Sequence, residues 1–508
     1  YIRMLDDDAL GSEVTRRIKE NNQWAQGALR DVIFEYVAHF DKMDDAYLRE
    51  RATDIKDLGA RVLAQLQDTI ELVSDVDFPE HTILVSEELT PSMLGEVPEN
   101  KLVALVSAKG SANSHVAILA RAMGIPTIMG AVDLPVKQMD GIKLVVDGYR
   151  GHLYTHPSPR MLEQFQAIVE EEKALVQGLE AIKELPAQTT DGHRLKLLVN
   201  TGLITDAYRS LDKGAEGVGL YRTEVPFMMR DRFPSETEQA NIYRSQLEAF
   251  APQPVTMRTL DIGGDKALSY FPIEEDNPFL GWRGIRVTLD HPEIFLLQVR
   301  AMLKASHGLN NLKIMLPMIT STSEVEEALH FIYRAYQEVI EEGIEVEMPE
   351  VGVMIEVPAA VYQAKQLASM VDFLSVGSND LTQYLLAVDR NNPRVAGLYD
   401  SFHPSVLAAL QHIVNAGKSE NCPVSVCGEM AGNPAGALIL MAMGYDMLSM
   451  NATNVPRVKS VLRSTDLIYA QEVLSDVMQL DSAQVIGSTL ELALNKLGQS
   501  RMLGPRAT

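Results

Sequence analysis

Cysteine, aromatic residues and uninterrupted apolar runs are all scarce in this chain of 508 residues. Its two cysteines, Cys422 and Cys427, are too few for a disulfide framework, which indicates a reducing compartment and predicts a cytoplasmic protein. The sequence contains neither an apolar stretch of about 18 residues nor a signal-peptide pattern, so we do not expect membrane insertion. It begins at Tyr1 rather than Met, and we therefore expect a missing upstream part.

Positive charge is also in short supply, with 45 Lys and Arg residues against 69 Asp and Glu residues and a net charge of −24. Such a field repels phosphate backbones and anionic lipids, so nucleic acid is not expected as a partner. The composition, 46% hydrophobic and 22% charged, is that of a globular protein. The length predicts two to four domains.

Four segments differ in their residue patterns. Residues 1–74 are charged and have helical periodicity, which predicts packed helices. Residues 75–156 contain short β-rich runs around one helix and predict a small α/β domain. Residues 157–189 are acidic and helix-favouring and predict a linker helix, and residues 190–508 form the largest segment.

The largest segment alternates apolar runs with helix-length amphipathic stretches. Near-continuous apolar runs of this kind predict parallel strands covered on both faces. The runs are RLKLLVN, GVGLYRTE, PVTMRTLD, LKIMLPMI, VGVMIEVP, FLSVGSND, VSVCGEM and MLSMN. Eight such strands, separated mostly by helices, predict a closed (β/α)8 TIM barrel.

Polar residues stand at or just after the ends of the strands predicted in these runs, where a TIM barrel carries its reacting groups. They are Asn200, Arg222, Arg258, Glu356, Asn379, Asp380 and Cys427. Arginines, carboxylates and a thiol at one mouth predict a site for a phosphorylated carboxylic acid and a hard metal, Mg²⁺. Further candidates are Lys266, Arg283 and Arg390. Taken singly, each residue has a structural alternative: a capping or turn acid, a solvated cation or a buried thiol.

The small domain holds a second candidate, in GSANSHVAILARAMGIPTIMG. Small residues open into a helix, and His115 stands in the first turn of that helix. The free N–H groups at a helix start favour neutral imidazole and an adjacent anion. Neutral histidine is the form that attacks phosphorus, although an ordinary helix-capping histidine fits the same pattern.

The stretch from about residue 46 to about residue 467 resembles enzyme I of the bacterial phosphotransferase system. The motifs GAEGVGLYRTE, RTLDIGGDK, NPFLGWRGIR, VGSNDLTQYLLAVDRNNP and CGEMAGNP are similar to its phosphoenolpyruvate-binding barrel. YLRERATDIKDLGARVL is similar to its carrier-binding helical domain. GSANSHVAILARAMGIPTIMG, VVDGYRGHL and YRTEVPFM are closer to the nitrogen-related branch than to the sugar branch.

This resemblance implies a phosphoenolpyruvate-protein phosphotransferase that is a cytoplasmic homodimer. His115 would take the phosphoryl group and pass it to an HPr-like carrier. The implied substrate residues are Arg222, Arg258, Asn379 and Arg390, beside the candidates Asp380, Lys266 and Arg283. Glu356 and Asp380 would hold Mg²⁺, and Cys427 would protonate the enolate to give pyruvate.

The resemblance also implies an N-terminal region upstream of this stretch, which we expect to be missing here, and this expectation leaves carrier docking open. Three alternatives remain. A pyruvate phosphate dikinase or phosphoenolpyruvate synthase would add an ATP-grasp domain, and no Gly-rich nucleotide site is visible in this sequence. A Mg²⁺-dependent aldolase would use Glu356 and Asp380 without His115. A regulatory phosphoprotein would need only the phosphorylated state.

Overall fold

The computed structural model places the chain in two compact units. The first comprises residues 1–172 with 507–508, and the second comprises residues 173–506. The structure describes residues 10–20, 23–40, 59, 62–63, 78–90, 93–94, 97–98, 100–109, 116–117, 120, 124–131, 134–148, 150–202, 204–228, 230, 232–264, 266, 268, 270–390, 392, 394–499 and 502.

The first unit contains a pair of packed helices, α2 (Leu10–Glu20) and α3 (Ala25–Phe40). Their polar faces are joined by an ion pair of 2.6 Å between Arg17 and Glu35. Ala28, Leu29 and Val32 are almost fully buried, and their three- and four-residue spacing places them on one face of α3.

The same unit contains two small sheets. Strands β1 (Thr82–Ser86), β2 (Leu102–Ser107) and β3 (Thr127–Ile128) are parallel, and β4 (Leu144–Asp147) pairs antiparallel with β5 (His152–Thr155). Leu102 and Leu105 of β2 are buried against Val116 and Ala120. Strands β1, β2, β4 and β5 lie in runs that the sequence predicted to be β-rich, whereas β3 lies outside those runs.

Helix α7 (Pro159–Ala181) follows, and the Ser158 hydroxyl caps its first turn by accepting a hydrogen bond from the Met161 amide. This helix occupies most of the segment for which a linker helix was predicted. Among the helices that the structure describes, none combines the length and apolar character needed to cross a membrane.

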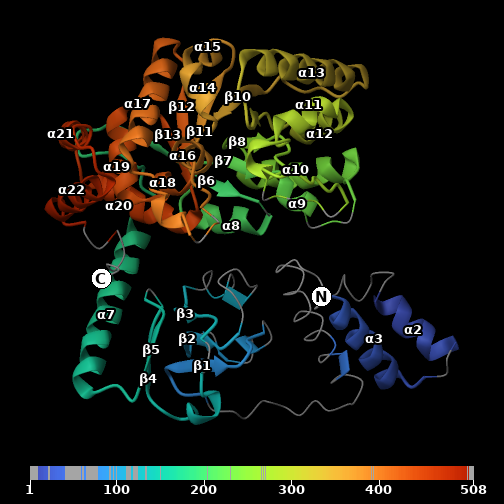
Figure 1. Ribbon diagram of the computed structural model, residues 1–508, viewed down its shortest axis with the longest axis vertical. Helices are drawn as coiled ribbons and strands as arrows, with labels where there is room; N and C mark the ends of the chain where they lie inside the picture. Colours follow the sequence, from blue (N-terminus) through green and yellow to red (C-terminus); the bar gives the residue numbers. More distant parts are fainter. Residues whose placement is uncertain are drawn as a thin grey trace. The chain divides into compact units, whose positions relative to one another are not determined.

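The second unit is a closed barrel of eight parallel strands (Figure 1). They are β6 (Lys196–Thr201), β7 (Val218–Arg222), β8 (Val255–Arg258), β9 (Leu312–Leu316), β10 (Glu350–Ile355), β11 (Phe373–Gly377), β12 (Val424–Cys427) and β13 (Met447–Met450). Each predicted apolar run overlaps one of these strands. The predicted multidomain architecture with a TIM barrel is therefore confirmed.

Helices surround the barrel and bury the outward-facing side chains of its strands. They are α8 (Ile204–Asp212), α9 (Glu224–Met228), α10 (Glu236–Phe250), α11 (Ile285–Asp290), α12 (Pro292–Ser306), α13 (Thr322–Glu341), α14 (Pro358–Tyr362), α15 (Ala364–Ala368), α16 (Ser378–Leu386), α17 (Pro404–Ser419), α18 (Glu429–Gly432), α19 (Pro434–Met443), α20 (Val455–Arg463), α21 (Leu467–Val477) and α22 (Ala483–Lys496). Capping boxes at Ser235 and Ser321 fix the starts of α10 and α13.

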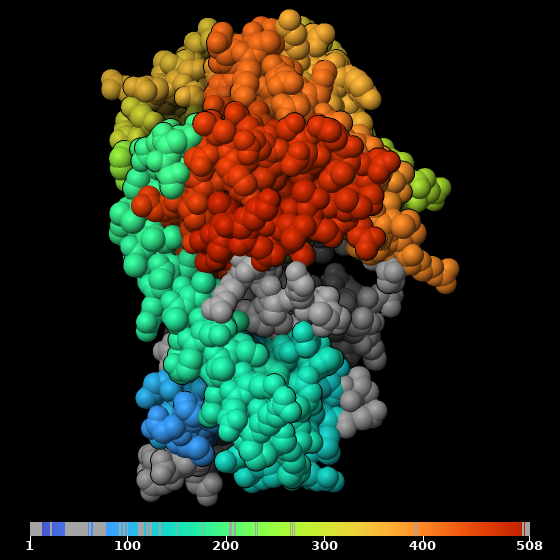
Figure 2. Space-filling model, turned by 90° about the vertical axis from the view of Figure 1, so that its left-hand side faces the viewer, coloured from blue at the N-terminus to red at the C-terminus, as the bar shows by residue number. Residues whose placement is uncertain are grey.

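The last helices pack on α19, so the C-terminal segment adds to the barrel unit. Figure 2 shows this segment, coloured red, as one continuous area of the unit's surface. Inside the barrel, a separate layer of buried side chains fills the lumen. It consists of Leu220, Met315, Met354, Phe373 and Cys427. The lumen is therefore packed, and chemistry has to take place at its rim.

Candidate active site

The predicted site residues stand at or just after the carboxyl ends of barrel strands. The set comprises Arg222 and Arg258, which end β7 and β8; Glu356, after β10; Asn379 and Asp380, in the first turn of α16; and Cys427, which ends β12. Arg222 and Arg258 also pair in register. Because the strands are parallel, these positions share one rim of the barrel.

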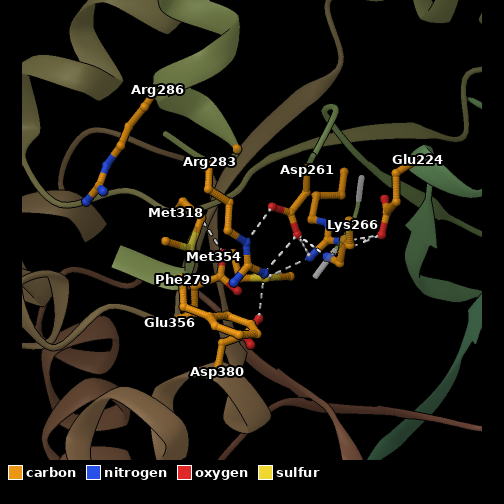
Figure 3. Close-up of polar contacts among 12 residues, drawn as sticks. Glu224, Asp261, Lys266, Phe279, Arg283, Arg286, Met318, Met354, Glu356 and Asp380 are labelled. Carbon is orange, nitrogen blue, oxygen red and sulfur yellow. Dashed lines mark hydrogen bonds and ion pairs between the residues drawn. The ribbon is translucent and has the colours of Figure 1, made fainter. Parts of the chain in front are cut away.

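A buried carboxylate, Asp261, lies at the centre of the cations at this rim (Figure 3). Its Oδ2 is 3.0 Å from Arg258 Nη1 and also accepts a hydrogen bond from Lys266. Its Oδ1 accepts a hydrogen bond of 3.2 Å from Arg283 Nε. Burial alone would raise the pKa of Asp261, but these three positive charges hold that pKa well below its usual value.

A second buried carboxylate, Glu224, faces the same cations from α9. Arg258 Nη2 donates to its Oε1 at 2.6 Å, and Lys266 Nζ lies 3.5 Å from the same oxygen. Burial opposes ionisation, yet the charges of Arg258 and Lys266 lower the pKa of Glu224. Arg258 is therefore held by two carboxylates, while its Nε has no hydrogen-bond partner in the described part of the chain.

Arg283 links this cluster to the α16 side of the rim. Its Nη2 donates both to Asp261 Oδ2 at 3.3 Å and to Asp380 Oδ2 at 3.0 Å, and its Nη1 donates to the Tyr384 hydroxyl at 3.3 Å. On the other side of Asp380, Arg390 Nη2 lies 3.6 Å from Oδ1. Burial opposes ionisation of Asp380, but these charges lower its pKa.

Glu356 has the least charge compensation of the acids at the rim. Its Oε1 accepts a hydrogen bond of 2.7 Å from the Met318 amide, while its Oε2 is buried without a partner among the described residues. Burial and the negative charges of Asp380 and Asp261 raise the pKa of Glu356 to about 8. A buried oxygen with neither a donor nor a cation is costly, so this position favours an added positive ligand.

Glu356 and Asp380 together fit a divalent cation of the Mg²⁺ type. In each carboxylate, one oxygen lacks a hydrogen bond within the described residues. Those residues contain no cluster of three or more His, Cys, Asp or Glu side chains suited to a metal. The protein therefore offers a pair of hard oxygen ligands and leaves the rest to substrate and water, which is how Mg²⁺ is commonly bound.

Cys427 lies in the lumen layer at the end of β12 and is 3% exposed. Its Sγ accepts a hydrogen bond from the Ser375 hydroxyl at 3.6 Å, and its thiol donates to the Val376 carbonyl at 3.5 Å. Burial raises the pKa of this thiol to about 11, and the nearby charge of Glu356 acts in the same direction. Cys427 therefore carries a proton at neutral pH, at the end of the strand that reaches the rim.

Three predicted residues lie outside the buried cluster. Asn200 accepts a hydrogen bond of 2.6 Å from Ser449 and so joins β6 to β13. Asn379 accepts from the Glu429 amide at 3.1 Å, at the start of α18. Arg222 is exposed, although its charge acts on Glu224 and Cys427. The structure thus brings Arg258, Lys266, Arg283, Glu356, Asp380, Arg390 and Cys427 together and leaves Arg222 and Asn379 at the edge.

His115 and the loop before it, residues 110–115, lie outside the residues that the structure describes. Helical residues follow directly at Val116 and Ala117. The prediction that His115 accepts the phosphoryl group therefore stays a prediction.

The sequence interpretation missed Glu224 and Asp261. Both follow a strand-ending arginine by two or three residues, in YRTE and RTLD. An acid so close to a cation, among apolar neighbours, is a signal for a buried ion pair. These two acids lie just beyond the strand-ending arginines, outside the strands themselves.

Three family models match the chain in succession. They describe a PEP-utilising enzyme's N-terminal part at residues 1–51, its mobile domain at residues 78–151 and its PEP-binding domain at residues 176–467. A protein of Escherichia coli strain K12, named "Phosphoenolpyruvate-dependent phosphotransferase system", is 44% identical over 99% of this chain and 67% of its own length. The phosphoenolpyruvate-protein phosphotransferase of Haemophilus influenzae is 38% identical over 97% of this chain and 85% of its own length.

The chain belongs to the phosphoenolpyruvate-protein phosphotransferase (enzyme I) family. It is therefore a transferase, and the family resemblance predicted from its motifs is confirmed. The barrel unit contains the whole of the PEP-binding match, and the two small sheets lie in the mobile-domain match or next to it. A solved structure described as "N-terminal domain of Enzyme 1 - Nitrogen" is 37% identical over 33% of this chain and 67% of its own chain, with a TM-score of 0.23.

Proposed function

We propose that this enzyme I family member transfers the phosphoryl group of phosphoenolpyruvate to His115, passes it to a histidine of an HPr-like carrier and releases pyruvate. The observation that carries the proposal is that the barrel rim contains both a buried hydrogen-bond donor and a buried acceptor that lack partners in the part of the chain that the structure describes. Arg258 Nε is a buried donor without a partner, and Glu356 Oε2 is a buried acceptor without one, within the described residues. An anion that arrives with a divalent cation satisfies both.

The anion would be held by the cations that surround Asp261. Arg258 keeps Nε available while its Nη groups are fixed by carboxylates, so its orientation is set before the substrate binds. Lys266 adds a point charge beside it, and Arg222, Asn379 and Arg390 would complete the shell from the edge. Preorganised donors of this kind stabilise charge that develops on a transferred phosphoryl group and on an enolate oxygen.

Glu356 and Asp380 would hold Mg²⁺. When bound, this ion neutralises charge on the phosphoryl and carboxylate oxygens of the substrate. The role of the protein is to fix the two ligands. The Met318 amide holds Glu356, and Arg283 holds Asp380.

The proposed transfer needs only phosphoenolpyruvate, His115, Cys427 and a proton from solvent. The Nε2 lone pair of neutral His115 forms a bond to phosphorus, and the bond between phosphorus and the enol oxygen breaks with its electrons on that oxygen. The methylene carbon of the resulting enolate takes the proton of the Cys427 thiol and gives pyruvate. Water then returns a proton to the thiolate, and the carrier histidine removes the phosphoryl group from His115.

The test of the proposed function is the mass of the intact chain after incubation with phosphoenolpyruvate and Mg²⁺. We expect one added phosphoryl group that is acid-labile and base-stable, as phosphohistidine is, and that is lost when an HPr-like carrier is added. No added group in the presence of both ligands would contradict the proposal. A requirement for ATP would instead favour a dikinase.

A second prediction concerns the metal. Glu356→Gln keeps the acceptor for the Met318 amide but removes a negative oxygen, so Mg²⁺ should bind roughly tenfold or more weakly. The measurement is the Mg²⁺ dependence of phosphoenolpyruvate binding by isothermal titration calorimetry. Glu350→Gln is the matched control, because Glu350 starts the same strand at the opposite end of the barrel and pairs with Lys313 there. An unchanged Mg²⁺ dependence in Glu356→Gln would remove this residue from the metal site.

The motifs closer to the nitrogen-related branch support the proposal that the carrier belongs to a nitrogen-regulating system. We also propose a cytoplasmic homodimer formed through the barrel. Size measurement of the full chain in solution, with and without phosphoenolpyruvate, tests the oligomeric state.

A further inference from the structure

Asp261 is a fully buried carboxylate of the rim. It contacts three cations, Arg258, Lys266 and Arg283. A carboxylate so deeply buried is stable only when it is well compensated, and each of the three cations likewise needs a buried anion. The four side chains therefore depend on one another for both charge and position.

Two sets of backbone hydrogen bonds bring these partners close to Asp261. Gly263 and Lys266 exchange backbone hydrogen bonds of 3.1 and 3.2 Å, which turns the chain back so that the Lys266 side chain reaches Asp261. The Gly284 amide donates to the Ile262 carbonyl at 3.0 Å, which places Arg283 beside Asp261.

Gly263 is required for this approach. It has a φ of 101°, and a Cβ there would lie 2.5 Å from the Trp282 carbonyl oxygen. Only glycine allows both the left-handed conformation and the close contact between the two segments. The conformation of the loop between β8 and α11 thus fixes the contacts of Asp261 with Lys266 and Arg283.

The partners of Asp261 divide into two groups. Arg258 and Lys266 also contact Glu224, and this group faces the proposed anion. Within the described residues, Arg283 forms no hydrogen bond or ion pair with Glu224, and its other ionic partner is Asp380, a proposed metal ligand. Four hydrogen bonds occupy most of the five N–H donors of Arg283, and all of them go to Asp261, Asp380 and Tyr384.

We infer that Asp261 is a positioning residue that couples the two halves of the site: it orients Arg258 and Lys266 toward the anion and, through Arg283, orients Asp380 toward the metal. In this arrangement Arg283 acts mainly by holding Asp380. The inference rests on the proposed function, because it assigns a cause to the geometry of that same site. Figure 3 shows the arrangement, with Asp261 between Lys266 and Arg283, and with Arg286 directed away from the cluster.

The test compares Asp261→Asn with Glu224→Gln. Both variants remove one buried negative charge while preserving side-chain shape, but only Asp261 contacts Arg283. Calorimetry measures phosphoenolpyruvate binding at saturating Mg²⁺, and separately measures Mg²⁺ binding at saturating phosphoenolpyruvate. We expect Asp261→Asn to weaken both by about tenfold or more, the usual scale for a residue that orients a ligand. Glu224→Gln should weaken phosphoenolpyruvate alone.

Asp290→Asn serves as the control, because Asp290 is exposed and contacts Trp282 by a hydrogen bond of 2.7 Å outside the cluster. It should change neither affinity. If Asp261→Asn weakens the binding of only one ligand, or if Glu224→Gln weakens the binding of both equally, the proposed coupling role of Asp261 is wrong. If the unsubstituted protein binds neither ligand, the proposed function fails instead, so the two failures are distinguishable.

Loss of a buried charge can also unfold a protein, so the melting temperature of each variant is measured. Should Asp261→Asn fail to fold, Arg283→Lys provides the second route. Lysine keeps the charge but cannot bridge Asp261 and Asp380 with a planar fork. We expect this variant to weaken Mg²⁺ binding more than phosphoenolpyruvate binding. Equal effects on both ligands, or none, would overturn the inference.

Discussion

His115→Ala is expected to abolish phosphorylation of the chain by phosphoenolpyruvate while leaving the affinity for phosphoenolpyruvate and Mg²⁺ unchanged. The physical reason is the separation of the two functions along the chain. The cations and carboxylates proposed to bind substrate all belong to the barrel unit, residues 173–506, whereas His115 belongs to the first unit. Removing the imidazole removes the nucleophile and none of the anion's donors. The mass of the protein after incubation with phosphoenolpyruvate measures phosphorylation, and calorimetry measures the two affinities.

The matched control for this experiment is His152→Ala. His152 lies in β5 of the same unit, is exposed and contacts Tyr154 at 3.3 Å. It is thus a histidine of the same unit that belongs to a strand and not to the start of a helix. It should be phosphorylated, at His115, to the same extent as the unsubstituted chain. Persistent labelling of His115→Ala at another residue would show that the acceptor histidine had been assigned wrongly.

The barrel and its rim could be predicted because parallel strands impose strong regularities. Each strand is buried on both faces, so it reads as a continuous apolar run, and its carboxyl end meets those of its neighbours. That rule placed Arg258, Glu356 and Cys427 on one rim without any knowledge of distances. It is a property of the backbone topology and needs no detail of side-chain packing.

The pairing among the rim residues could not be predicted in the same way. Asp261, Lys266 and Arg283 come from a long loop between β8 and α11, and their meeting depends on the turn at Gly263 and on the hydrogen bond from Gly284 to Ile262. Loop conformations of this kind leave no periodic signal. The sequence therefore indicated Lys266 and Arg283 as separate candidate ligands, whereas the structure shows that most donors of Arg283 are taken by protein oxygens.

Cysteine chemistry at the rim likewise depends on an environment that the sequence only partly reveals. Cys422 and Cys427 are both buried, and burial raises the pKa of each thiol to about 11. Their positions differ: Cys427 ends β12 next to the charges of the rim, while Cys422 precedes the strand and its thiol points to the Val371 carbonyl at 3.8 Å. Equal acidity in different places makes Cys422 a well-matched control for Cys427.

Cys427→Ala should accordingly bind phosphoenolpyruvate and Mg²⁺ with near-normal affinity. Its turnover rate should be lower than that of the unsubstituted chain by a factor of roughly 10² or more, the usual scale for losing a general acid. The cations and the metal act on the phosphoryl group and the enolate oxygen, whereas the thiol is proposed to act on carbon. Exchange of the pyruvate methyl hydrogens with solvent deuterium, followed by NMR, isolates that carbon step and should fall by a similar factor. Cys422→Ala should leave both rates unchanged.

The raised pKa of Cys427 adds a pH dependence with a definite sign. A general acid works only while it holds its proton, and burial keeps the thiol protonated until the pH approaches about 11. Proton delivery to the enolate should therefore stay constant from pH 7 to roughly pH 10 and decline above that, rather than near the usual thiol pKa of about 8.5. Native turnover by Cys427→Ala, or damage confined to Cys422→Ala, would mean that a different group protonates the enolate.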